Sequence, residues 1–135
     1  MLEIRDLTVE ETLQLAVARH EGATGTKVAV DFGNLPESLD YPLRIGLYRL
    51  VQEGLRNAYR HARGLGQKVR AAVSGNWIEI VISDGGAGEP AAKTEVGFGL
   101  AGLRNRLEIF GGTLEFIQDG TRGSRLVGRV PLGPA

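Results

Sequence analysis

The segment from residue 53 to residue 61 brings together four side chains that could bind a metal-chelated phosphate. Their spacing places them on one face of a helix: Glu53, Asn57, Arg60 and His61. The amide oxygen of Asn57 can bind Mg²⁺ without adding negative charge beside a phosphate. A carboxylate at Glu53 can hold a metal-bound water or accept a proton, and Arg60 and His61 can contact phosphate oxygens. An ordinary solvated helix face carries similar residues, so this segment alone leaves both interpretations open.

A second candidate site follows the apolar run at residues 78–82. Asp84 comes at the end of this run and is followed by Gly85, Gly86 and Gly88. The carboxylate can accept a hydrogen bond from an exocyclic amine such as that of adenine, and the glycines allow a mobile turn. A plain Asp-Gly turn without a ligand is the alternative interpretation.

A third candidate is the glycine-rich segment at residues 97–102, which contains Gly97, Gly99 and Leu100. It opens a predicted helix, where backbone N–H groups and the helix dipole favour an anion. Its glycine spacing also matches the dinucleotide fingerprint, but residues 90–96 are not a buried strand and only one hairpin follows. We therefore interpret the segment as a phosphate site and exclude a dinucleotide fold.

The remaining pattern predicts the elements that position these sites. Thr8 and Glu11 form a capping box ahead of a helix over residues 8–19, and Pro42 opens a long helix to about Ala62. A third helix is predicted over residues 100–110, and strands over 27–32, 67–73, 77–83, 113–118 and 124–130. The central helix carries an apolar stripe made of Leu47, Val51, Leu55, Ala58 and Ala62. The pattern predicts an α+β sandwich with three helices over one mixed sheet of about five strands; the strand order does not follow from it.

Composition narrows the function further. The 135 residues suit a single domain over residues 1–135, and 16 basic residues balance 16 acidic ones. This balance argues against a nucleic-acid binder. The chain has no cysteine, and it shows neither a long apolar run nor a signal sequence. We expect a cytoplasmic segment without direct membrane contact.

The three candidate sites occur in an order that resembles the N, G1 and G2 boxes of the histidine-kinase ATPase domain. This domain belongs to a superfamily shared with gyrase B, Hsp90 and MutL. The N-box segment at residues 48–62 and the Gly102-Leu-Arg-Asn-Arg106 segment resemble the sensor-kinase subfamily of the nitrate and membrane-fluidity sensors. The resemblance implies the Bergerat-type ATP-binding fold, with ATP and Mg²⁺ as ligands.

The resemblance also implies residue roles. Asn57 would coordinate Mg²⁺, Glu53 would act as base or hold the metal's water, and Arg60 and His61 would face the phosphates. Asp84 would bind the adenine amino group, with Ser124 supporting it through water. Gly86 and Gly88 would flex a short ATP lid at residues 89–96. Gly97 and Gly99, followed by Leu100, would let the backbone close on the phosphates.

The implied reaction is transfer of the γ-phosphoryl group of Mg-ATP to a histidine on a separate dimerisation domain, which then phosphorylates a response regulator. His20-Glu21 imitates an acceptor motif, but it lies inside the predicted first helix and no partner helix follows. We therefore expect the chain to lack its own acceptor, either as an excised fragment or as a naturally short protein. An anti-sigma-factor-type serine kinase and a non-catalytic nucleotide-responsive module are the alternatives. The sequence contains no motif that identifies the sensed signal, the cognate regulator or the oligomeric state.

Overall fold

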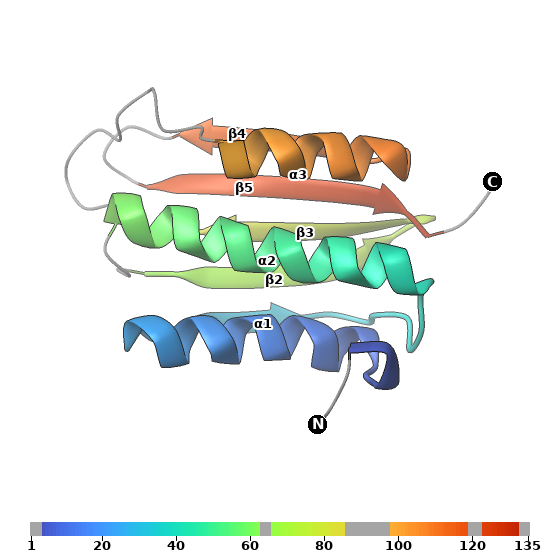
Figure 1. The fold of residues 1–135 in the computed structure, drawn as a ribbon, viewed down its shortest axis with the longest axis horizontal. Coiled ribbons are helices and arrows are strands. Elements are labelled where there is room, and N and C mark those ends of the chain that lie inside the picture. Colours follow the sequence, from blue (N-terminus) through green and yellow to red (C-terminus); the bar gives the residue numbers. More distant parts are fainter. Residues whose placement is uncertain (1–3, 63–65, 86–97, 119–122, 133–135) are drawn as a thin grey trace.

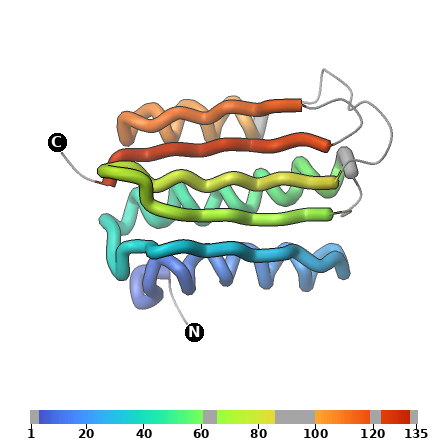
Figure 2. Tube along the Cα trace, turned by 180° about the vertical axis from the view of Figure 1, so that it is seen from behind, coloured from blue at the N-terminus to red at the C-terminus, as the bar shows by residue number. Residues whose placement is uncertain are grey.

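Three helices cover one face of a five-stranded sheet, as the sequence predicts (Figure 1). The computed structural model describes residues 4–62, 66–85, 98–118 and 123–132. After a short 3₁₀ turn at Ile4–Asp6, the helices are α1 (Val9–Thr24), α2 (Tyr41–Ala62) and α3 (Phe98–Ile109). The strands are β1 (Ala29–Phe32), β2 (Lys68–Ser74), β3 (Trp77–Ser83), β4 (Thr113–Gln118) and β5 (Ser124–Pro131). Seen from behind, the opposite face of the sheet carries none of the helices in the described residues (Figure 2).

The sheet is mixed, with the strand order β1-β2-β3-β5-β4. β1 runs parallel to β2, with Ala29 opposite Lys68, whereas the other neighbours are antiparallel. A parallel pair needs a long crossover, and α2 supplies it between β1 and β2. β2 and β3 are joined by a two-residue turn, in which Gly75 has φ +60°. The positive φ of Gly75 is what a tight hairpin turn needs.

The capping box of α1 is confirmed. The Thr8 hydroxyl accepts from the Glu11 backbone N–H at 3.1 Å, and the Glu11 carboxylate accepts from the Thr8 N–H at 2.9 Å. The predicted end of this helix at residue 19 is wrong, because α1 continues through Gly22 to Thr24. Burial of His20 keeps the last turns on the core, and Gly25, with φ +74°, ends the helix in the left-handed conformation.

Two other predicted boundaries shift by two residues. β1 begins at Ala29 and not at residue 27, and α3 begins at Phe98 and not at residue 100. Shifts of this size at element ends are expected because terminal turns are set by neighbouring contacts. No helix within the described ranges is long and apolar enough to cross a membrane.

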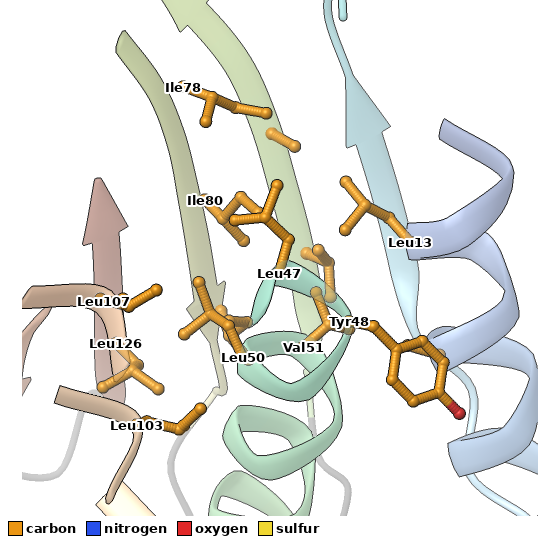
Figure 3. Packing of buried hydrophobic residues seen from close by; sticks show 14 of the residues in the cluster. Leu13, Leu47, Tyr48, Leu50, Val51, Ile78, Ile80, Leu103, Leu107 and Leu126 are labelled. Atoms are coloured by element: carbon orange, nitrogen blue, oxygen red, sulfur yellow. The ribbon is translucent and has the colours of Figure 1, made fainter. Parts of the chain in front are cut away.

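The core lies between α2 and the sheet. The predicted apolar stripe is buried at Leu47, Val51, Leu55 and Ala58, whereas the side chain of Ala62 lies outside the described part. Alternate residues of β3, Ile78, Ile80 and Ile82, point to the same core. Figure 3 shows Leu47 and Leu50 of α2 next to Ile80 of the sheet, with Leu13 of α1 and Leu107 of α3 on either side.

Glycines let α2 lie close to the sheet. A Cβ atom at Gly128 of β5 would lie 2.5 Å from Leu50 Cδ2, and one at Gly54 of α2 would lie 3.0 Å from Ile82 Cδ1. Separations below about 3.4 Å are repulsive for carbon atoms. The absence of a side chain at both positions therefore sets the height of the helix above β3 and β5.

Candidate nucleotide-binding site

The predicted site residues gather at one edge of the molecule. The end of α2, the end of β3, the start of β5 and the start of α3 meet at this edge, on the left in Figure 1. α2 runs in the same direction as β3, so residues late in each element lie at the same end. The fold thus brings together four segments that are far apart in the sequence.

Asp84 and Ser124 form a directly bonded pair between β3 and β5. The Ser124 hydroxyl donates to Asp84 Oδ2 at 2.6 Å, and the Ser124 backbone N–H donates to Oδ1 at 3.2 Å. The Asp84 N–H in turn donates to the Ser124 carbonyl at 3.1 Å. Both residues are buried, each 8% exposed. Hydrogen bonds to a carboxylate are short and strong, so this carboxylate is held in one orientation at the sheet edge.

The resemblance to known kinases implied that Ser124 would support Asp84 through a water. In the structure the hydroxyl also contacts the carboxylate directly. Asp84 and Ser124 follow the Ser83–Arg125 pair of the antiparallel β3–β5 ladder, and residues directly opposite each other in such a ladder are close enough for side-chain contact. The register of the two strands therefore creates the pair.

The four predicted residues of the polar face of α2 differ in exposure and in partners. Asn57 is 8% exposed, and its amide makes no hydrogen bond to another side chain or backbone group within the described ranges. Glu53 is partly exposed and its carboxylate lies 3.3 Å from Arg56 Nη1. Arg60 is exposed, and His61 lies in the last turn of α2, where its side chain is outside the described part. Arg44 Nε is the one buried side-chain polar atom without a partner in the described ranges, so the Asn57 amide is not an orphaned buried group and keeps access to a ligand.

Close packing fixes this helix face relative to Asp84. Gly54 of α2 lies over Ile82 and Leu126, since its Cβ would come within 3.0 Å and 3.2 Å of their side chains. Ile82 and Leu126 are paired across β3 and β5, and they stand two residues before Asp84 and two residues after Ser124. Asn57 follows Gly54 by three residues in the same direction. The amide and the carboxylate therefore project at the same end of the core.

The glycine segments are described only in part. Gly86, Gly88, Gly97 and the predicted lid at residues 89–96 lie outside the described residues. Gly99 lies in the first turn of α3. Leu100, also in that turn, is 5% exposed and belongs to the hydrophobic core.

The residue types present fit a magnesium nucleotide better than a free metal ion. Within the described ranges, no group of three or more His, Cys, Asp or Glu side chains could hold a metal. Mg²⁺ takes few protein ligands when phosphates complete its shell, so the Asn57 amide suits a phosphate-bound ion. A separate cavity of about 490 Å³, lined by Tyr41, Leu43, Phe110 and Leu132 among others, lies at the start of α2 and the end of β5, away from this site. Its largely apolar lining offers nothing to bind phosphate.

His20 has a structural position. It lies in α1, is 9% exposed, and its Nε2 is 3.2 Å from Gln67 Oε1. Glu21 is engaged too, since its carboxylate accepts from the Val28 N–H at 2.8 Å. Sequence reasoning passed over Gln67, which is 2% exposed; the only signal was a polar residue directly ahead of a strand.

Comparisons with known proteins show the family of this chain. The profile of the family described as histidine kinase-, DNA gyrase B-, and HSP90-like ATPase matches residues 43–134. The chain belongs to this family. DegS of Brevibacillus brevis, a signal transduction histidine-protein kinase/phosphatase, is 30% identical over 134 residues, which cover 97% of this chain and 34% of DegS. UhpB of Salmonella typhimurium, which carries the same description, is 29% identical over 130 residues, covering 96% of this chain and 26% of UhpB.

Solved structures show the same fold. The catalytic domain of the histidine kinase ThkA superposes with a TM-score of 0.74 over 95% of this chain and 96% of that domain, at 14% identity. The histidine kinase AdeS of Acinetobacter baumannii gives a TM-score of 0.69 at 18% identity and covers 93% of this chain and 64% of that one. The resemblance to sensor histidine kinases is thereby confirmed, and the chain is a catalytic domain of that type. It spans about a quarter to a third of the length of DegS and UhpB.

Proposed function

We propose that this chain binds Mg-ATP between Asp84 and the polar face of α2, and passes the γ-phosphoryl group to a histidine on a separate dimerisation domain. The observation that carries the proposal is the Asp84–Ser124 pair, a fixed and buried acceptor at the same edge as Asn57. An acceptor at one end and a hard metal ligand at the other match the two ends of Mg-ATP.

In this reaction each residue acts mainly by binding and orientation. Asp84 accepts a hydrogen bond from the adenine amino group, and Arg60 and His61 contact phosphate oxygens. Asn57 would hold Mg²⁺, which would neutralise phosphate charge. The histidine nitrogen of the acceptor attacks the γ-phosphorus, the bond to the bridging oxygen of ADP breaks, and Glu53 takes the imidazole proton. Positioning and charge neutralisation account for most of the catalysis of phosphoryl transfer. The phosphorylated histidine then donates its phosphoryl group to a response regulator.

A two-step experiment tests the proposal. Calorimetric titration first measures Mg-ATP binding, and the chain is then incubated with γ-labelled ATP and the dimerisation domain of a relative such as DegS. We expect acid-labile label on the supplied domain. Acid-stable label on a serine of an added protein would favour the serine-kinase alternative. Binding of ATP without transfer to any supplied acceptor domain would favour a nucleotide-responsive module, and absence of ATP binding would reject all three.

A further inference from the structure

Gln67 is a buried hydrogen-bond hub next to the proposed site. It stands directly before β2 and is 2% exposed. Its Oε1 accepts from the Thr26 hydroxyl at 3.1 Å and lies 3.2 Å from His20 Nε2, and its Nε2 donates to the Leu55 carbonyl at 3.0 Å. The side chain thus joins α1, the segment before β1 and the middle of α2.

The contact with α2 lies two residues before Asn57. Within a regular helix the Leu55 carbonyl already accepts from the N–H four residues later, so the Gln67 amide adds an external bond to a helix that needs none. A buried bond to a helix carbonyl fixes the helix laterally, where the apolar contacts of Leu55 alone are not directional. Gln67 therefore locates the turn of α2 from which Asn57 projects.

Gly66, the residue before Gln67, contacts the part of the site that is proposed to bind adenine. Gly66 has φ +62°, and a Cβ atom there would lie 2.9 Å from both Cα and the backbone nitrogen of Gly85. Gly85 follows Asp84 directly. The backbone of Gly66 therefore packs against the chain at the proposed adenine acceptor, at a distance that no side chain would permit.

We propose that Gln67 is a positioning residue that, together with Gly66, holds the metal-binding turn of α2 at a fixed distance from Asp84. We call this dipeptide the 66–67 brace. The inference rests on the proposed binding of Mg-ATP between Asp84 and Asn57. ATP must satisfy both ends at once, so its affinity depends on their separation, whereas adenosine needs only the Asp84 end and tripolyphosphate only the Asn57 end.

The physical reason is effective concentration: a ligand that is already held at one end of the site meets the other end at a high local concentration. When two contacts are held at the spacing of a bivalent ligand, the second contact forms without a further loss of freedom. If the spacing fluctuates, part of that advantage is lost while each single contact keeps its strength. Replacing a residue that only stabilises the fold would instead change the affinities of all three ligands alike, or change none of them.

The experiment compares three ligands on one pair of variants. Gln67→Met keeps the volume and removes all three hydrogen bonds. Thr26→Val is the matched control, since it removes one bond to Gln67 and leaves the bond to Leu55 in place. Dissociation constants for Mg-ATP, adenosine and Mg-tripolyphosphate are measured by NMR titration below the melting temperature of each variant. We expect Gln67→Met to weaken Mg-ATP about tenfold while adenosine and tripolyphosphate change about twofold or less, and Thr26→Val to leave the ratio of Mg-ATP to adenosine affinity unchanged.

Equal loss for Mg-ATP and adenosine in Gln67→Met, or an unchanged Mg-ATP affinity, would overturn the brace while leaving the proposed function intact. Failure of the unaltered chain to bind Mg-ATP would remove both proposals. If Gln67→Met does not fold, Gln67→Leu takes its place, because it also removes the donor to Leu55 and adds no buried charge. The same ratio of affinities decides the outcome.

Discussion

The Ser124 hydroxyl donates a 2.6 Å hydrogen bond to one oxygen of the Asp84 carboxylate, and the Ser124 backbone N–H donates to the other. Because each oxygen of the carboxylate meets a separate donor, this double contact fixes the plane of the group. Fixed orientation matters more than added strength, because the adenine amino group must meet the carboxylate in one geometry.

Removing the hydroxyl tests this arrangement. Ser124→Ala should weaken ATP binding by about 1 kcal/mol, the typical net value of one hydrogen bond, since the backbone N–H still holds the other oxygen. Calorimetric titration measures the change, and Ser74→Ala on the exposed end of β2 is the control. A loss equal to that of Asp84→Asn would mean that the hydroxyl alone orients the carboxylate.

Base selectivity should follow from Asp84. The chain should prefer ATP to GTP, because a carboxylate accepts from the adenine amino group and is repelled by the guanine carbonyl oxygen. Asp84→Asn should weaken ATP binding by about 1–3 kcal/mol, the range for hydrogen bonds to charged groups. Parallel titrations of both nucleotides check this, and equal affinities in the unaltered chain would reject the adenine role.

Asn57→Asp should separate the phosphate end from the base end. The added negative charge beside the phosphates disfavours them, so Mg-ATP should lose about tenfold or more in affinity while adenosine changes little. Asn34→Asp, in an exposed loop, makes the same chemical change away from the site and should leave both ligands unaffected. Parallel losses for Mg-ATP and adenosine would place Asn57 elsewhere.

Two glycines should respond to alanine in opposite directions. Gly22 is an exposed helical residue whose Cβ would meet nothing within 4 Å, so Gly22→Ala should stabilise the chain by about 0.5–1 kcal/mol. At Gly112 a Cβ would lie 2.4 Å from the Arg129 carbonyl oxygen, so Gly112→Ala should destabilise it by about 2 kcal/mol or more. Urea unfolding measures both, and a stabilising Gly112→Ala would contradict the packing of α3 against β5.

The isolated chain should not label itself on histidine. His20 is buried in α1 beside Gln67, and in-line attack needs an acceptor nitrogen about 3–3.5 Å from the phosphorus. His61 is expected to face the phosphates from the side. Incubation with γ-labelled ATP should leave the chain unlabelled until a domain with an acceptor histidine is added. Acid-labile label on His20 would make the chain a self-contained kinase.

Much of the fold could be predicted because local signals and global packing agree. The capping box at Thr8 and Glu11, the apolar stripe of α2 and the Gly75-Asn76 turn each act within a few residues. The end of α1 could not be predicted, because Gly22 reads as a break, whereas the last turns make contacts with distant residues such as that of His20 with Gln67. The strand order depends on contacts between distant residues, for which a single sequence gives no direct signal.

Some features of the candidate site could likewise be predicted from the sequence, and others could not. Asn57 and Asp84 were predicted from residue type and position, and the described structure places both at one edge. The direct bond from Ser124 depends on the register of β3 and β5, and the role of Gln67 on three partners from other segments. Such contacts are products of the tertiary structure.

The parallel pairing of β1 with β2 has a consequence for the order in which the chain folds. The β2–β3 and β4–β5 pairs are hairpins that close over few residues, which is a microsecond event, whereas β1 can join only after α2 has formed and docked. Such non-local pairing is slow. Until it happens, β2 is an open sheet edge able to pair with another copy of the chain. The four residues of β1 therefore cover the open edge of β2 late in folding and so limit self-association. A chain shortened to begin at α2 should aggregate during refolding, even though the proposed nucleotide site lies elsewhere.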